Sequence, residues 1–225
     1  MRALIAFDLD GVLYSSEPFL GEAYRDAIAN VNARHPGSFP RVPTTREILD
    51  HVGWPVPVIL ERLFPAVDPV AVELLYVETL DVIAAYVRRG DGLLFPGVRE
   101  TLRRLCAAGY ALVIASNGRQ SYVEAVLEVN DIAPYFGELL TVDRGRMTTK
   151  ADLLRAYRAR YELPVVRLVM VGDRASDVEA AVAVGCHFVG CDYGHGYQHE
   201  IEGVGPIVSG FDQLPEVIAR VLAET

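Results

Sequence analysis

Near its beginning the chain reads Ala3-Leu4-Ile5-Ala6-Phe7-Asp8-Leu9-Asp10-Gly11-Val12-Leu13. The apolar run predicts a buried strand, and the glycine after the second acid predicts a turn. Side chains two residues apart on an extended segment point to the same side, so Asp8 and Asp10 share one side of the strand's end. Two such carboxylates repel each other, and a hard cation such as Mg²⁺ relieves that repulsion. Alone, the stretch fits two solvated acids equally well, so the rest of the chain must decide.

Residues 15–91 have the apolar periodicity of helices. Apolar side chains recur at helical spacing over 17–33, 56–64 and 69–89. Thr44, with Glu47 three residues later, predicts the capped start of a further helix. We therefore predict a helical cap domain at 15–91, inserted after the first strand of a core that is formed by residues 1–14 and 92–225.

From Phe95 onward, helical and strand-like segments alternate. Predicted strands lie at 110–115, 138–142, 167–171, 187–190 and 206–208, and predicted helices lie at 98–108, 119–130, 150–161, 175–184 and 212–222. The charged segment at 143–146 is expected to be a solvated loop. Continuous apolar strands separated by helices are typical of a parallel sheet covered on both faces. The predicted fold class is α/β: a doubly wound, Rossmann-like parallel sheet with an inserted helical cap domain.

The composition narrows the choice of partners. Of the 225 residues 51% are hydrophobic, and the formal net charge is -9 at pH 7. This negative charge disfavours nucleic acid or an anionic membrane as the main partner. The three cysteines form no C-x-x-C pattern, so neither a disulfide framework nor a zinc site is expected. Because there is no signal-peptide pattern and no apolar run of membrane-spanning length, we expect a soluble cytoplasmic protein, either monomer or homodimer.

Polar residues follow several of the predicted strands. Ligands of doubly wound sheets bind outside the carboxyl ends of the strands. At those ends the sequence supplies Asp8 and Asp10, the turn Ser116-Asn117-Gly118, and Gly172-Asp173 with Asp177 four residues later, while Lys150 begins a helix. Since parallel strands end at the same edge, we expect these groups to meet there.

The residue types fit one chemistry. Asp8, Asp10 and Asp173 can supply oxygens to Mg²⁺. The turn at Ser116 can cradle a phosphate through its hydroxyl and backbone amides, and Lys150 can neutralise a phosphoryl oxygen. A carboxylate that faces such a phosphoryl group can attack phosphorus, while a second carboxylate protonates the leaving oxygen.

Taken together, these motifs resemble the haloacid dehalogenase-like hydrolase superfamily over essentially the whole chain. The motifs are Asp8-Leu9-Asp10-Gly11-Val12-Leu13, Ser116-Asn117, Lys150 and Gly172-Asp173-Arg174-Ala175-Ser176-Asp177. The resemblance implies Asp8 as the nucleophile and Asp10 as a general acid/base that lends its backbone carbonyl to Mg²⁺. The implied site residues are catalytic Asp8, Asp10 and Lys150; phosphate-binding Ser116, Asn117 and Lys150; and metal-binding Asp8, Asp10, Asp173 and Asp177.

The helical insertion is similar to the cap of the phosphoglycolate phosphatase-like and β-phosphoglucomutase-like branch. The resemblance implies a Mg²⁺-dependent phosphatase that hydrolyses a small phosphorylated metabolite through an aspartyl-phosphate. Alternatives are a phosphomutase of the β-phosphoglucomutase type, a pyrophosphatase and, outside the enzymes, a phosphoacceptor signalling domain. Ala151-Asp152 after Lys150, in place of Pro-x-Pro, argues against the mutase. The chain length and the large insertion argue against the signalling domain.

Substrate contacts are expected from the cap and from the turn after Ser116. Our candidates are Thr44, Arg46 and Arg119, although Arg119 fits the simple start of a helix equally well. Trp54 fits packing within the cap better than a place in the substrate pocket. The sequence leaves open the roles of Arg174, Trp54 and His195.

Overall fold

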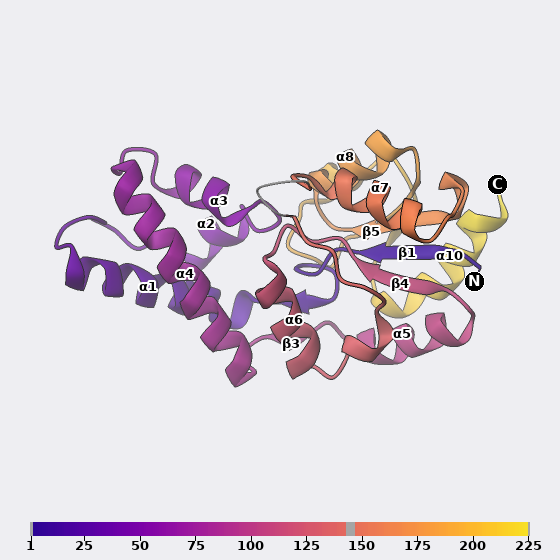
Figure 1. Cartoon of the computed structure of the whole chain (residues 1–225), viewed down its shortest axis with the longest axis horizontal. Coiled ribbons are helices and arrows are strands. Elements are labelled where there is room, and N and C mark those ends of the chain that lie inside the picture. The colour runs from indigo at the N-terminus through magenta and orange to yellow at the C-terminus, as the bar shows by residue number, and fades with distance from the viewer. Residues whose placement is uncertain (1, 143–146, 225) are drawn as a thin grey trace.

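The computed structural model describes residues 2–142 and 147–224. The segment at 143–146, expected to be a solvated loop, lies outside the described residues. The main sheet has five parallel strands in the order β4-β1-β5-β6-β7 (Figure 1). They are β1 (Leu4–Phe7), β4 (Ala111–Ile114), β5 (Leu168–Gly172), β6 (His187–Cys191) and β7 (Ile207–Val208). The predicted parallel core is therefore confirmed.

Helices cover both faces of this sheet because side chains alternate along each strand. Ile5 and Phe7 belong to one buried cluster, which contains side chains of α5 (Val98–Ala107), α6 (Gln120–Val129) and α10 (Leu214–Ala223). Leu4 and Ala6 belong to the opposite cluster, with α7 (Lys150–Arg160) and α8 (Ala175–Val184). All four strand residues are fully buried, which explains why the strand reads as a continuous apolar run.

Four helices are inserted in the chain between β1 and the remaining strands of the main sheet. They are α1 (Glu17–Arg34), α2 (Thr45–Leu49), α3 (Val56–Leu63) and α4 (Pro69–Arg89). They share a buried cluster of their own, and Figure 1 shows them at one end of the molecule, with both chain termini toward the other. The predicted helix start at Thr44 is confirmed, since Thr44 and Glu47 form a reciprocal capping box. The cap boundaries at 15 and 91 stay a prediction.

The two chain crossings between the helical part and the core run side by side. β2 (Tyr14–Ser15) pairs antiparallel with β3 (Leu93–Leu94) in a small sheet that the sequence did not predict. Other short elements are η1 (Ala133–Tyr135), η2 (Val165–Arg167), α9 (Gln198–Ile201) and η3 (Phe211–Gln213). The paired crossings connect α1–α4 to the core through two adjacent segments of the chain.

The predicted strand at 138–142 is wrong, because those residues form no strand. The hydroxyl group of Tyr157, on α7, accepts a hydrogen bond from the Leu140 amide at 2.7 Å and donates one to the Leu140 carbonyl at 3.3 Å. A single side chain thus satisfies both backbone groups that a neighbouring strand would have paired. Of these residues Leu140 is buried, and its backbone partner is a tyrosine of α7 in place of a strand.

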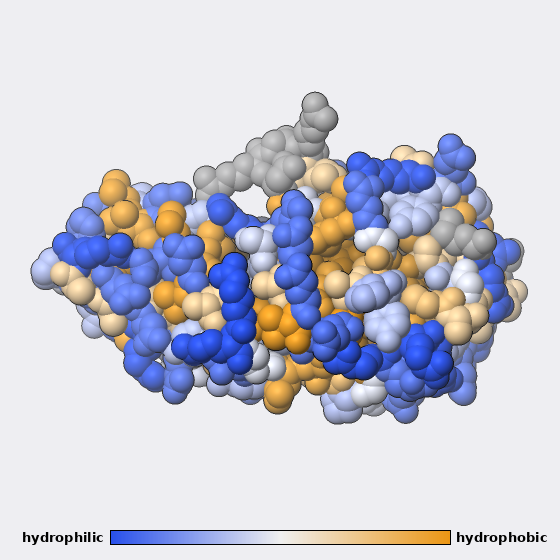
Figure 2. All heavy atoms as spheres, turned by 60° about the horizontal axis from the view of Figure 1, so that its bottom comes forward, coloured by the Kyte–Doolittle hydropathy of each residue, from blue (hydrophilic) through white to orange (hydrophobic). Residues whose placement is uncertain are grey.

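Both charged and apolar side chains are visible on the surface. Figure 2 shows a face on which charged and polar side chains predominate at both ends, with apolar side chains visible between them. Among the helices in the described part of the chain, none is long and apolar enough to cross a membrane.

Candidate active site

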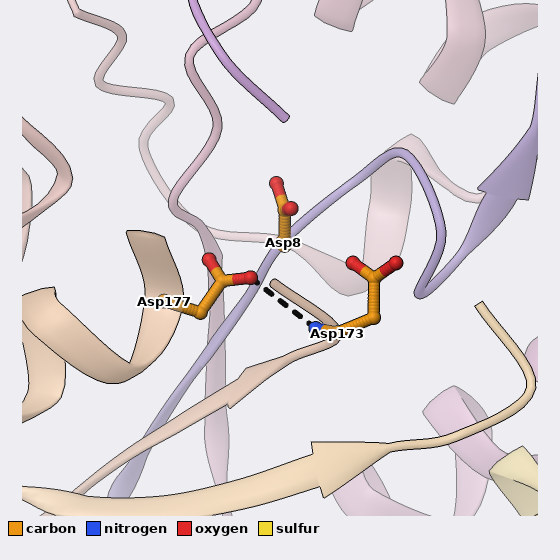
Figure 3. Close-up of side chains that lie close together, drawn as sticks. All are labelled: Asp8, Asp173 and Asp177. Atoms are coloured by element: carbon orange, nitrogen blue, oxygen red, sulfur yellow. Dashed lines mark hydrogen bonds between the residues drawn. The ribbon is translucent and has the colours of Figure 1, made fainter. Parts of the chain in front are cut away.

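Three buried carboxylates meet at the carboxyl edge of the sheet. Asp8 follows β1, Asp173 follows β5, and Asp177 lies in the first turn of α8. Figure 3 shows the three side chains converging from these elements. Each offers an oxygen, and these oxygens all lie within 4.8 Å of one another. The sequence prediction that these aspartates meet is confirmed by this geometry.

Lys150 completes the cluster from the first residue of α7. Its Nζ lies 2.8 Å from Oδ2 of Asp8 and 2.7 Å from Oδ1 of Asp177, and the residue is 3% exposed. The start of α7 is fixed by a capping box between Thr149 and Asp152. Lys150 is the single lysine of the chain, whose lysines and arginines together number 21. The compact ammonium group fits between two carboxylates where a planar guanidinium group would need more room.

Backbone amides orient the carboxylates. Asp8 Oδ1 accepts from the Leu9 amide at 2.8 Å, and Asp177 Oδ2 accepts from the Asp173 amide at 3.2 Å. Asp173 Oδ2 accepts from the amides of His195 and Gly196 at 2.8 and 2.9 Å. Oδ1 of Asp173 is buried and has no hydrogen-bond partner among the described residues. A buried oxygen that remains free to accept is a ligand position for a cation.

The buried carboxylates of the cluster carry more negative charge than Lys150 alone neutralises. Burial raises the pKa of Asp173 to about 7, and the negative charge of Asp177 adds to the shift. Burial also raises the pKa of Asp8, although Lys150 opposes the shift. For Lys150 burial acts to lower the pKa, but the charges of Asp177 and Asp8 outweigh it and raise the pKa above its usual value. Three carboxylates and one ammonium group leave two negative charges, so this all-oxygen donor set fits a hard divalent cation.

Asp10 faces a different part of the site from the three aspartates. Its Oδ1 accepts a hydrogen bond of 2.6 Å from the hydroxyl group of Tyr122, on α6. Burial raises the pKa of Asp10 to about 6, and the Tyr122 hydrogen bond opposes the shift. The turn after Asp10 requires glycine: Gly11 has a φ of 84°, and a Cβ there would lie 2.2 Å from the carboxylate of Asp173. A carboxyl group with a pKa near neutrality is suited to proton transfer.

The turn after β4 brings Ser116 to the same edge. Ser116 is buried, and its Oγ accepts from the Gly118 amide at 3.0 Å. The Asn117 side chain donates from Nδ2 to the carbonyl of Gly53, in the cap, at 2.7 Å. Ser116 thus keeps its hydroxyl proton for an incoming anion, while the Asn117 side chain joins the core to the cap.

A cavity of about 90 Å³ lies between the cap and the carboxyl edge of the sheet. Both Asp8 and Asp10 line it, together with Arg119 and Tyr122. Its cap side is formed mainly by apolar side chains and by the turn before α3: Leu20, Tyr24, Val52, Gly53, Trp54, Val56, Ile59, Leu80 and Ile83. A phosphate ester would therefore place its leaving group against a largely apolar wall.

The three predicted substrate contacts lie in different places. Arg119 lines the cavity and donates from Nε to the hydroxyl group of Tyr76 at 2.8 Å. Thr44 and Arg46 are not among the residues that line it. The Thr44 side chain caps α2, and Arg46 forms an ion pair with Asp50 at 2.8 Å.

The structure also locates the residues whose roles the sequence left open. Trp54 lines the cavity as well as contacting the apolar cluster of the cap. His195 contributes its backbone amide to Asp173, and Arg174 bonds to the cap turn at Asp50. Tyr122 is a cavity residue that sequence reasoning missed. Its one signal was its position, one helical turn beyond Arg119 on the helix after the Ser116 turn.

The sequence pattern of the haloacid dehalogenase-like hydrolase family matches residues 3–185. The chain belongs to this family. A phosphoglycolate phosphatase from Vibrio vulnificus is 30% identical over 224 residues, which cover 96% of this chain and 95% of the relative. A phosphoglycolate phosphatase from Haemophilus influenzae is 29% identical over 229 residues, covering 96% of this chain and 97% of the relative.

Solved structures resemble the fold over nearly its whole length. A crystal structure described as a "predicted phosphoglycolate phosphatase" from Haemophilus somnus has a TM-score of 0.82 at 24% identity, covering 96% of this chain and 97% of that one. A "predicted phosphatase" from Clostridium acetobutylicum has a TM-score of 0.80 at 22% identity, with 98% and 99% covered. At these identities the structures establish only the fold, a parallel α/β sheet with inserted helices. The sequence prediction of a haloacid dehalogenase-like hydrolase is confirmed.

Proposed function

We propose that this hydrolase is a Mg²⁺-dependent phosphatase that acts on a small phosphorylated metabolite through an aspartyl-phosphate at Asp8. The observation that carries the proposal is that Asp8 and Asp10, two residues apart in the chain, have different surroundings. Asp8 lies beside Lys150 at 2.8 Å and close to Asp173 and Asp177, whereas Asp10 is held apart by Tyr122. A nucleophile beside a cation and a proton carrier outside the cluster are what phosphoryl transfer requires.

The chemical steps follow from these positions. An oxygen of Asp8 attacks phosphorus, the bond from phosphorus to the ester oxygen breaks, and protonated Asp10 gives its proton to the leaving alkoxide. Asp10 then takes a proton from water, whose oxygen attacks phosphorus and frees Asp8 together with inorganic phosphate. The Lys150 ammonium group and the Ser116 hydroxyl hold the phosphoryl oxygens. We assign Mg²⁺ to Asp8, Asp173, Asp177 and the backbone carbonyl of Asp10; when bound, it would neutralise charge on the phosphoryl group.

The substrate we propose first is phosphoglycolate. The support is that both relatives named above are phosphoglycolate phosphatases that match nearly the full length of this chain. The cavity beside Asp8 is small, and Arg119 is a guanidinium group on its wall that suits a carboxylate. A compact ester with one anionic end fits this wall better than a polyhydroxylated sugar, which would leave hydroxyl groups against apolar side chains.

The test is phosphate release from phosphoglycolate, with and without Mg²⁺, followed by a screen of other phosphorylated metabolites. We expect Mg²⁺-dependent turnover that Asp8→Asn lowers by about a thousandfold or more, since the substitution removes the nucleophile. Asp131→Asn, at an exposed position far along the chain, is the matched control and should keep full activity. Turnover by Asp8→Asn at the unsubstituted rate would refute the nucleophile, and turnover of another ester alone would refute the substrate.

A further inference from the structure

A turn of the cap, residues 50–54, accepts three hydrogen bonds from the core, and the hydroxyl group of Tyr197 donates one of them to Oδ1 of Asp50 at 2.9 Å. Arg174 donates from Nη2 to the Asp50 carbonyl at 2.8 Å, and Asn117 donates from Nδ2 to the Gly53 carbonyl at 2.7 Å. Arg174 directly follows Asp173, and Asn117 directly follows Ser116, both residues of the candidate active site. The turn is therefore connected to the phosphate side and the carboxylate side of the site at once.

Arg174 is held in place by the core before it reaches the cap. The residue is 5% exposed, and its Nη1 donates to the His195 carbonyl at 3.3 Å. Its Nε lies 3.4 Å from Oε2 of Glu200. These contacts fix the planar guanidinium group, so little further freedom is lost when Nη2 binds the cap.

The cap turn is shaped to accept this arginine. Gly53 has a φ of 103°, which L side chains rarely adopt, and a Cβ at this position would lie 2.9 Å from Cγ of Arg174. The aliphatic part of Arg174 thus packs directly on the glycine backbone. Glycine is required here both for the turn and for the close approach.

The opposite side of the cap is attached differently. Phe19 and Ala23 of α1, with Tyr86 and Val87 of α4, belong to the same buried cluster as Ile5 and Phe7 of the core. Separating those apolar side chains would expose them to water, whereas the hydrogen bonds at residues 50–54 can be exchanged for bonds to water. The cap can therefore open at the turn while it stays attached near β2 and β3.

We propose that Arg174 is a positioning residue that, together with Asn117, latches turn 50–54 over the active site and so limits the leaving group to a compact one. The latched turn contributes Val52, Gly53 and Trp54 to the wall of the 90 Å³ cavity. Releasing it removes one wall of the space next to Asp8 and Asp10. The selection of leaving groups rests on the proposed phosphatase activity, but the latch itself does not.

Trp54 is the single tryptophan of the chain, so its fluorescence reports on the latch without any substrate. We would measure acrylamide quenching in the full-length protein and in Arg174→Met, which keeps a stem to pack on Gly53 but loses all donors to the cap. Losing a hydrogen bond from a charged donor shifts the ratio of latched to open turns by about tenfold, so quenching should rise by about twofold or more. Arg103→Met, on the exposed face of α5, is the matched control and should leave quenching unchanged.

A second variant reaches the same turn from the cap side. Gly53→Ala leaves Arg174 intact but places a methyl group against its Cγ, and should increase the quenching of Trp54 in the same way. If Arg174→Met does not fold, this variant tests the latch in its place. Arg174→Lys, which keeps the charge and part of the donor set, should give an intermediate value. Unchanged quenching of Trp54 in folded Arg174→Met, or in folded Gly53→Ala, would overturn the latch.

Kinetics test the consequence for specificity. For Arg174→Met we expect kcat/KM for phosphoglycolate to fall by about tenfold, while kcat/KM for the bulkier 4-nitrophenyl phosphate falls less or rises. A residue that only stabilises the fold would change both values by the same factor, and that outcome would overturn the selection of leaving groups. If no phosphate ester is hydrolysed, the proposed function is wrong. The quenching experiment still tests the latch, because it needs no substrate.

Discussion

The carboxylate cluster of the core and the cap turn above it are neighbours, yet they are built in opposite ways. The cluster consists of charged side chains, with Lys150 between Asp8 and Asp177, and each comes from a strand end or a helix start. The turn at residues 50–54 is held mainly through the backbone carbonyls of Asp50 and Gly53, with one further bond from the Tyr197 hydroxyl group to the Asp50 carboxylate. Chemistry is visible in a sequence because it needs particular side chains, whereas positioning through carbonyls is not, since every residue has one.

The largest effect is expected from breaking the core cluster. Lys150→Met leaves the buried carboxylates of Asp8 and Asp177 without their ammonium partner, which should lower the free energy of unfolding by about 3–5 kcal/mol. Activity should fall by about a thousandfold, because the group that neutralises phosphoryl charge is gone. Urea unfolding and phosphate release measure the two losses. Arg158→Met, exposed on the same helix, should change stability by no more than about 0.5 kcal/mol; equal losses in both variants would mean that Lys150 is not part of a cluster.

A smaller effect is expected on stability, which should depend on pH and Mg²⁺ through the carboxylate cluster and not through the turn. The pKa of Asp173 is raised to about 7 in the folded protein, so the folded state binds its proton more tightly than the unfolded state does. That stabilisation is complete below the ordinary aspartate range and is lost as the pH rises through about 7. A divalent cation that replaces the proton should therefore stabilise the protein most above pH 7.

Thermal unfolding at pH 5 and pH 8, with and without Mg²⁺, measures this linkage. At a hundredfold excess over its dissociation constant, a bound cation stabilises the folded state by about 2.7 kcal/mol, and we expect most of that gain at pH 8. Asp173→Asn should abolish it. A gain of equal size at both pH values would show that the cation does not compete with protons at these carboxylates.

The smallest effect concerns the cap at a distance from the latch. Thr44→Ala removes the capping box of α2 and should lower the free energy of unfolding by about 1 kcal/mol. Because Thr44 is absent from the cavity wall, KM should stay unchanged. Urea unfolding and steady-state kinetics distinguish the alternatives: a raised KM with unchanged stability would restore Thr44 as a substrate contact, as the sequence suggested.

The same contrast explains which parts of the fold and of the site could be predicted from the sequence. The alternation of strands and helices predicted the core, and the acids at strand ends predicted which side chains meet, because parallel strands end at one edge. The predicted strand at 138–142 was wrong, since the side chain of Tyr157, on α7, takes the place of a neighbouring strand. The partner of Arg174 could not be predicted, since a buried arginine at a helix start does not reveal which carbonyl it binds.

The most direct test of the account is the site of the covalent intermediate. The full-length protein would be mixed with phosphoglycolate and Mg²⁺, quenched in acid within the first turnover, reduced with borohydride and digested for mass spectrometry. An acyl phosphate on an aspartate is reduced to homoserine, so we predict homoserine at position 8, with Asp10, Asp173 and Asp177 unchanged. Rapid turnover with homoserine at another position, or with all four aspartates unchanged, would contradict the account.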